Sequence, residues 1–219
     1  MVSTQNLLGL SDTHIDFSLC EVPLHPDLRS PLTTLKRDAA SQGFTLTVAS
    51  GYRNFKRQCH IWNGKVTGVR PLLDMNEQQL DPKHLSPKAL VFAILRWSAL
   101  PGTSRHHWGT DFDIYEATAL QEKRLELSVA ETQLGGVFHD FYIWLDQYLQ
   151  KQTAFIRPYR YDTGGVSPEP WHLSYLPLAK EFSEMLTRDD YVSELLLHPF
   201  ALSDVVLDNI DEIWERFVI

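Results

Sequence analysis

The spacing of hydrophobic residues predicts helices in several separate parts of the chain. The first helical pattern begins at Ser30-Pro31, a capping residue followed by a proline suited to the first helical position, and Gly43 ends it. Apolar residues at helical spacing predict further helices over residues 54–62, 89–100, 137–149, 177–186, 191–197 and 205–218. Ser203 is a suitable N-cap for the last of them.

Short runs of β-branched or alternating residues lie between these helices. They predict strands over residues 44–49, 110–115, 154–156 and 171–175. Residues 64–87 are irregular, contain three prolines and predict a long surface loop. Helices mixed with non-adjacent strands are typical of the α+β class, so we expect a small antiparallel sheet flanked by helices.

The length of 219 residues fits one domain. We divide it into a main unit over residues 1–186 and a C-terminal helical extension over 187–219 that packs on the same domain. The extension contains the last two predicted helices, both amphipathic. We expect these helices to enlarge the hydrophobic core rather than to cap a cleft or form a dimer interface. The sequence does not determine the oligomeric state.

Charge and hydropathy narrow the classes of partner. The chain has 20 basic and 28 acidic side chains, a formal net charge of −8, which disfavours broad binding to nucleic acid. We expect no membrane span, because no stretch approaches the roughly 18 apolar residues that one needs. The first 28 residues contain no lysine, no arginine and no apolar run of signal-peptide length. We therefore expect a cytoplasmic protein, or a periplasmic one if a leader has been removed.

Three short segments concentrate residues that hydrolytic enzymes use. Ser50–Arg53 follows the first predicted strand, Ser104–Asp113 joins a loop to the next strand, and Glu169–His172 opens the last strand. The segments contain histidines and carboxylates, which are the ligands that catalytic zinc takes while it keeps a fourth position open. Together they predict a metal-dependent hydrolase.

The strand pattern orients these side chains. Residues alternate between faces, so Asp111 and Asp113 share one face of their strand. Pro170 favours an extended backbone at Glu169, which holds that carboxylate near the metal without making it a ligand. A carboxylate there can take a proton from metal-bound water and deliver it to a leaving amine. Arg53 supplies a permanent charge for a developing oxyanion or a substrate carboxylate.

In these segments the chain resembles the VanY-type D-alanyl-D-alanine carboxypeptidases, zinc peptidases of peptidoglycan. They belong to a wider group that includes lysostaphin-type enzymes and the hedgehog signalling domain. Three motifs carry the resemblance: SGYR with a following Gln, S-x-H-x-x-G-x-x-x-D and E-x-W-H. They are matched by Ser50 to Arg53 with Gln58, by Ser104, His106, Gly109 and Asp113, and by Glu169, Trp171 and His172. The resemblance covers roughly residues 28–177.

The resemblance implies a role for each matched residue. It implies that His106, Asp113 and His172 bind Zn²⁺, that Glu169 is the catalytic base, and that Arg53 binds the substrate or the transition state. It also implies the family fold, a small antiparallel sheet flanked by helices. As substrate-contacting candidates in or beside the motifs we name Ser104, Gln58, Tyr52, Trp171 and Asp111.

Asp111 departs from the family pattern. The family usually has a small residue, alanine, two positions before the ligand aspartate, whereas this chain has a second carboxylate there. Because Asp111 shares the metal face of its strand, it either tunes the site or contacts a substrate amine. The alternative is an aspartate that faces solvent or lies behind the ligands.

The resulting hypothesis is a zinc-dependent D-alanyl-D-alanine carboxypeptidase that hydrolyses a peptidoglycan stem peptide or muropeptide through a metal-activated water. One alternative is an endopeptidase of the same fold that cuts another stem bond, such as L-Ala–D-Glu. The other is a non-catalytic, zinc-containing binding module, a use of this fold that the hedgehog domain illustrates. The presence of both Glu169 and Arg53 favours an enzyme, because a binding module needs no proton shuttle.

Overall fold

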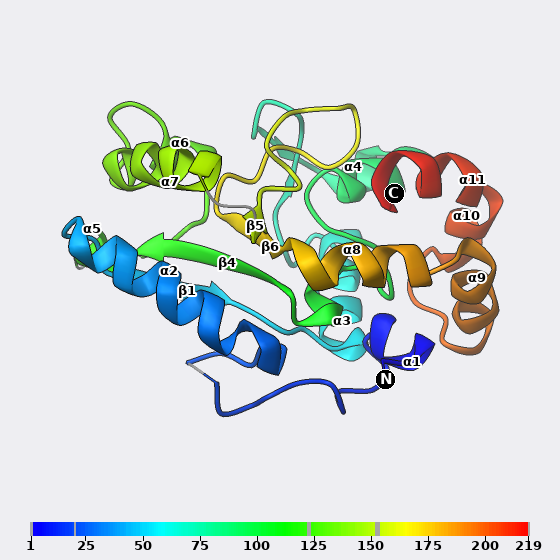
Figure 1. The fold of residues 1–219 in the computed structure, drawn as a ribbon. Coiled ribbons are helices and arrows are strands. Elements are labelled where there is room, and N and C mark those ends of the chain that lie inside the picture. Colours follow the sequence, from blue (N-terminus) through cyan, green and yellow to red (C-terminus); the bar gives the residue numbers. More distant parts are fainter. Residues whose placement is uncertain (1, 20, 122–123, 152–153, 219) are drawn as a thin grey trace.

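A four-stranded antiparallel sheet with the strand order β1-β4-β6-β5 forms the centre of the fold (Figure 1). The computed structural model describes residues 2–19, 21–121, 124–151 and 154–218. The strands of this sheet are β1 (Leu46–Ser50), β4 (Asp111–Glu116), β5 (Phe155–Ile156) and β6 (His172–Tyr175). Together with the surrounding helices, this sheet confirms the predicted α+β class.

Helices surround the sheet. The α-helices of the described residues are α1 (Thr4–Leu7), α2 (Arg29–Ser41), α3 (Phe55–Val66), α4 (Pro87–Leu95), α5 (Ala117–Leu120), α6 (Val129–Thr132), α7 (His139–Lys151), α8 (Leu176–Met185), α9 (Arg188–Leu197), α10 (Ser203–Asp208) and α11 (Ile210–Ile213). Short helices of other types are the 3-10 helices η1 (Pro26–Leu28), η2 (Pro82–His84) and η3 (Arg105–Trp108) and the π-helix η4 (Trp214–Val218). None of the described helices is long and apolar enough to cross a bilayer.

Three local predictions were wrong in detail. Helix α2 begins before Ser30, because the proline-initiated turn η1 runs directly into it. The predicted loop over 64–87 contains a small hairpin of β2 (Leu72–Leu73) and β3 (Gln79–Leu80), followed by η2.

The third difference is that the helix predicted over 205–218 is broken into three pieces. The break lies at Asn209, whose side chain donates a hydrogen bond to the Val205 carbonyl at 2.9 Å and so competes with the helical ladder. Ser203 is not the N-cap of α10. That position belongs to Leu202, which has a left-handed backbone with a φ of 64°.

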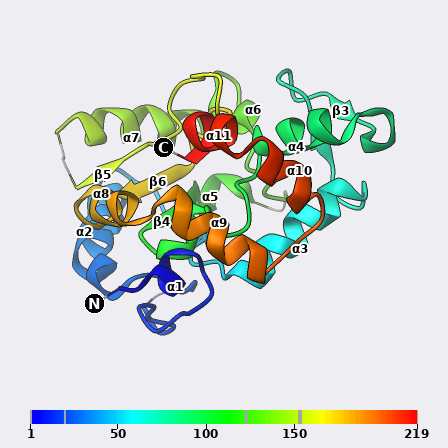
Figure 2. The ribbon, with the colours of Figure 1, turned by 90° about the vertical axis from the view of Figure 1, so that its right-hand side faces the viewer.

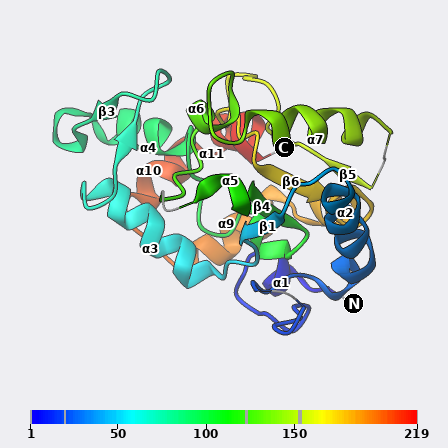
Figure 3. The same ribbon diagram turned by 90° about the vertical axis from the view of Figure 1, so that its left-hand side faces the viewer.

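One hydrophobic cluster covers the apolar face of the sheet. Alternation directs Phe112 of β4 and its β6 partner Leu173 to this face, where both are fully buried. Helices α2 and α7 supply Leu35 and Phe141 to the same cluster and lie beside the sheet (Figure 3). The opposite face of β4 and β6 therefore remains for polar residues.

A second cluster joins α3, α4 and α8 to the C-terminal helices. Trp62 of α3 is fully buried, and its indole N–H donates to the Ala201 carbonyl at 2.8 Å. Tyr191, Val206 and Ile213 of the last helices are buried in the same cluster. Helix α10 lies alongside α4, which in turn contacts α3 (Figure 2). The chain after residue 186 thus contributes to the same core as the helices before it.

This packing predicts that the C-terminal helices unfold together with the main unit. Replacing the fully buried Ile213 with alanine should lower the free energy of unfolding by about 2–5 kcal/mol, measured by urea denaturation. Leu197→Ala is the matched control, because that side chain is 72% exposed; its effect should stay within about 0.5 kcal/mol. Equal effects of the two substitutions would contradict a shared core.

Candidate active site

The site is built where β4 and β6 lie side by side on the polar face of the sheet. Asp113 of β4 is paired with His172 of β6, so the two side chains emerge next to each other. His106 comes from η3, immediately before β4. Gly109 makes the turn between η3 and β4 with a φ of 69°. A side chain does not fit there, because a Cβ would lie 2.4 Å from a side-chain carbon of Ile15.

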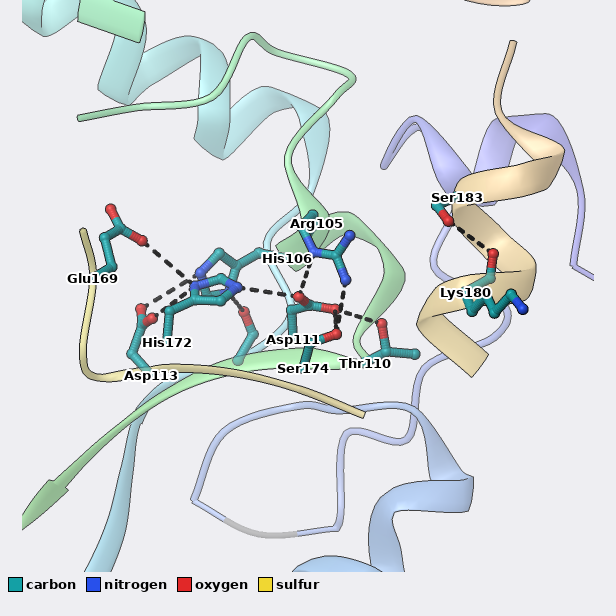
Figure 4. A network of polar contacts seen from close by, with 11 residues as sticks. Arg105, His106, Thr110, Asp111, Asp113, Glu169, His172, Ser174, Lys180 and Ser183 are labelled. Carbon is teal, nitrogen blue, oxygen red and sulfur yellow. Dashed lines mark hydrogen bonds and ion pairs between the residues drawn. The ribbon is translucent and has the colours of Figure 1, made fainter. Parts of the chain in front are cut away.

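His106, Asp113 and His172 form a buried group that can hold a metal ion. The distance from His106 Nε2 to Asp113 Oδ2 is 3.5 Å, and that from His172 Nδ1 to Asp113 Oδ1 is 3.2 Å (Figure 4). One potential ligand atom from each residue lies within 4.8 Å of the others. The structure therefore brings together the three residues that the resemblance names as ligands.

The far nitrogen of each imidazole ring has an acceptor as its partner. His106 Nδ1 lies 2.9 Å from the Gly51 carbonyl oxygen, and His172 Nε2 lies 3.1 Å from Asp111 Oδ1. A carbonyl or an ionised carboxylate only accepts, so each of these nitrogens carries the hydrogen. In the neutral rings the lone pairs of His106 Nε2 and His172 Nδ1 are directed into the group. Two nitrogen donors and one carboxylate fit a catalytic zinc site with an open position.

The two histidines differ in charge when no metal is bound. Burial lowers the pKa of His106 to about 4, so this ring is neutral at pH 7. Burial acts in the same direction on His172. There, however, hydrogen bonds to the carboxylates of Asp111 and Asp113 outweigh it and raise the pKa to about 9. A metal must therefore displace a proton from His172.

Glu169 lies at the edge of this group without entering it. Its Oε2 is 3.7 Å from His172 Nδ1, and its backbone N–H donates to the Tyr159 carbonyl at 2.9 Å. Burial raises the pKa of Glu169 to about 7. A carboxyl group that gains and loses a proton near neutral pH is suited to general acid–base catalysis.

Arg53 is held in place from behind. One guanidinium nitrogen donates to Gln58 Oε1 at 2.9 Å and another to Ser50 Oγ at 3.3 Å. The Gln58 amide in turn donates to the Ala99 carbonyl at 2.7 Å. Both ends of Gln58 are thus engaged inside the protein, so this residue supports Arg53 rather than meeting a substrate.

A cavity of about 120 Å³ connects these groups. Arg53, Glu169 and the three metal-binding candidates line it, as do Ser104 and Trp171 from the predicted substrate-contacting set. The other three predicted substrate contacts lie elsewhere. Gln58 lies behind Arg53, the Tyr52 ring packs edge-on against His14, and Asp111 is fully buried behind His172.

Several residues that line this cavity are not among the residues predicted from the sequence, and they include Trp97 and Arg105. Trp97 follows α4 and belongs to none of the motifs. Arg105 stands between the matched residues Ser104 and His106, and its role depends on the burial of its partner Asp111. The only sequence signal for it was the unusual carboxylate at Asp111.

Fold and site together define a class: a metal-dependent hydrolase with a His-Asp-His group, a carboxylate and an arginine around one cavity. The family model VanY, described as D-alanyl-D-alanine carboxypeptidase, matches residues 21–178. This is most of the chain, and the chain therefore belongs to the VanY family of peptidoglycan carboxypeptidases. The predicted family and enzyme class are confirmed.

Curated relatives agree with this assignment. The chain is 29% identical over 127 residues to an uncharacterised protein of Haemophilus influenzae, covering 55% of this chain and 93% of that protein. It is also 29% identical over 161 residues to a D-alanyl-D-alanine carboxypeptidase of Enterococcus faecalis. That match covers 71% of this chain and half of the relative.

Solved structures show the same fold. VanYB in complex with D-alanine-D-alanine is 26% identical with a TM-score of 0.50, and the match covers 78% of this chain and 83% of that one. The LD-carboxypeptidase LdcB is 25% identical with the same TM-score, covering 82% and 74%. A mutant of the D,D-pentapeptidase VanY in complex with Zn(II) is 24% identical with a TM-score of 0.52, covering 83% and 92%.

The raised pKa of His172 predicts how metal affinity depends on pH. In the metal-free protein His172 is protonated below a pKa of about 9. Zinc competes with that proton, so its apparent affinity should rise up to about tenfold per pH unit between about pH 7.5 and 9. Competition with a chelator of known pH dependence measures the slope. An affinity that stays constant over this range would contradict the assigned charge state.

Proposed function

We propose that the protein is a zinc-dependent D,D-carboxypeptidase that removes the terminal D-alanine from a peptidoglycan stem peptide. One observation carries the proposal: a buried His-Asp-His group, a carboxyl group with a pKa near 7 and an anchored arginine line one small cavity. Family membership and the likeness to VanYB, which was solved with D-alanine-D-alanine, support this substrate.

His106, Asp113 and His172 would hold the zinc ion. The donor set fits zinc, because both imidazole lone pairs point into the group and Asp113 adds a carboxylate oxygen. A VanY relative of the same fold was solved in complex with Zn(II), which supports this choice of metal. A zinc ion held by these residues would supply a Lewis acid that polarises a substrate carbonyl and lowers the pKa of water.

Glu169 would move the proton. Its carboxylate lies beside the metal group, where it can accept a proton from the attacking water and deliver it to the leaving amine of D-alanine. Burial favours the protonated form that this transfer produces. The backbone hydrogen bond from Glu169 to the Tyr159 carbonyl fixes the position of Glu169 in the wall of the cavity.

Arg53 would bind the negative end of the substrate. A carboxypeptidase must recognise a free terminal carboxylate, and a guanidinium group is suited to bind one through paired N–H groups. The two contacts to Gln58 and Ser50 engage two of the five N–H groups of Arg53 and fix its plane. A half-buried cation in a small cavity favours the end of a peptide over an internal bond, and therefore favours a carboxypeptidase over an endopeptidase.

A second candidate activity is that of an L,D-carboxypeptidase, which removes D-alanine from a tetrapeptide. The likeness to the LD-carboxypeptidase LdcB supports it, since identity and coverage are close to those of VanYB. Both activities use the same metal group, proton carrier and terminal carboxylate. They differ in the residue that precedes the scissile bond. The cytoplasmic location, with recycled muropeptides or free precursors as substrates, stays a prediction.

The proposed role of Glu169 predicts the behaviour of Glu169→Gln. Glutamine keeps the size of the side chain but cannot carry the proton, so kcat should fall by about 10²- to 10⁴-fold. Zinc content, measured by plasma mass spectrometry, and the unfolding midpoint should stay at wild-type values. Hydrolysis at the wild-type rate would remove Glu169 from the mechanism.

The substrate proposal predicts the outcome with a panel of stem peptides. A pentapeptide ending in D-Ala-D-Ala should lose one alanine, with kcat/KM at least about tenfold above that for the tetrapeptide. Mass spectrometry of the products, with a chelator-treated sample as control, reads this directly. A preference for the tetrapeptide would establish the L,D activity instead, and cleavage between L-Ala and D-Glu would establish an endopeptidase.

A further inference from the structure

Asp111 is a second buried carboxylate behind the metal group. It lies on the same face of β4 as Asp113, opposite Ser174 of β6, and its side chain is 0% exposed. Asp111 does not line the cavity. Instead its Oδ1 accepts a hydrogen bond from His172 Nε2 at 3.1 Å, on the side of the ring that faces away from the metal group (Figure 4).

Several further donors hold this carboxylate in one orientation. Asp111 Oδ1 accepts from Arg105 Nε at 2.7 Å. Asp111 Oδ2 accepts from the hydroxyl groups of Thr110 at 2.8 Å and Ser174 at 3.1 Å. Arg105 also donates to the Ser174 hydroxyl at 2.7 Å, and its guanidinium group lies 4.7 Å from the centre of the Trp108 ring. The carboxylate cannot turn away from His172 without breaking several contacts.

Burying this carboxylate is costly unless a cation accompanies it. Arg105 supplies that cation, and its own side chain is only 19% exposed. A small apolar residue at position 111 would pack β4 against β6 without any charge. Sheet packing alone therefore does not explain the pair.

The two histidines of the metal group are supported differently. His106 donates to a neutral backbone carbonyl, whereas His172 donates to an ionised carboxylate. A carboxylate behind a metal-binding imidazole fixes the orientation of the ring and makes its other nitrogen a stronger donor. His172 is thus oriented and polarised more strongly than His106.

We propose that Asp111, paired with Arg105, is a positioning residue that fixes His172 Nδ1 as a metal donor and sets the zinc affinity of the site. The proposal rests on the proposed zinc-binding function of His106, Asp113 and His172. Asp111 acts only through His172, which it contacts on the side of the ring away from the other two metal-binding candidates, and it does not line the substrate cavity.

The decisive experiment measures zinc affinity by chelator competition at about pH 9.5 for wild type, Asp111→Asn and Ser174→Ala, because above a His172 pKa of about 9 no proton competes with zinc for this ring. Asp111→Asn removes the charge behind His172 and should weaken zinc binding by about 10- to 100-fold. Ser174→Ala removes one hydrogen bond to Asp111 but leaves the contact to His172, so its affinity should stay within about threefold of wild type. Thermal unfolding of each metal-free variant separates affinity from folding.

Two results would overturn the proposal: an Asp111→Asn affinity within threefold of wild type, or equal losses for both variants. If Asp111→Asn does not fold, nitrogen NMR of the zinc-loaded wild type decides. The proposal requires a proton on His172 Nε2 that exchanges slowly with water, and a proton-free or rapidly exchanging Nε2 would refute it. If the wild type binds zinc but hydrolyses no stem peptide, the proposed activity fails while the affinity comparison stays valid.

Discussion

The pairing of β4 with β6 is the constraint on which the site depends. This register places Asp113 opposite His172 and Asp111 opposite Ser174, while Phe112 and Leu173 fill the core on the other face. A shift of one residue would turn the carboxylates into the core and the aromatic ring toward the cavity. The hydrophobic packing that fixes the fold therefore also fixes the geometry of the metal group.

The same arrangement brings several ionisable groups into a small buried volume. Asp111 and Asp113 are opposed by Arg105, Arg53 and the protonated His172, so the charges largely compensate one another. Glu169 is the exception, because burial outweighs the nearby cations and raises its pKa to about 7. The residue with the least stable negative charge is thus the one placed to carry a proton.

The residues that bind the metal or carry the proton could be predicted from the sequence, whereas most residues that hold them in position could not. The metal-binding candidates stand in short motifs, each of which lies within one or two neighbouring elements. The alternation of polar and apolar residues around Asp113 was enough to predict the strand and the face on which Asp113 lies. The positioning residues depend on contacts between distant segments, such as that of Gln58 in α3 with Ala99.

Tyr52 shows what proximity in the sequence cannot predict, since it is adjacent to Arg53 in the chain but packs against His14. Likewise, the break at Asn209 results from one side-chain hydrogen bond that apolar periodicity does not reveal.

The most direct test of the metal site is a crystal structure of the zinc-loaded protein with anomalous diffraction data at the zinc edge. A single strong peak is expected, bonded to His106 Nε2, an Asp113 carboxylate oxygen and His172 Nδ1, with Glu169 nearby but not coordinated. Asp111 should keep its contact to His172 Nε2. A zinc ion bonded through His172 Nε2, or a peak away from these three residues, would contradict the site described above.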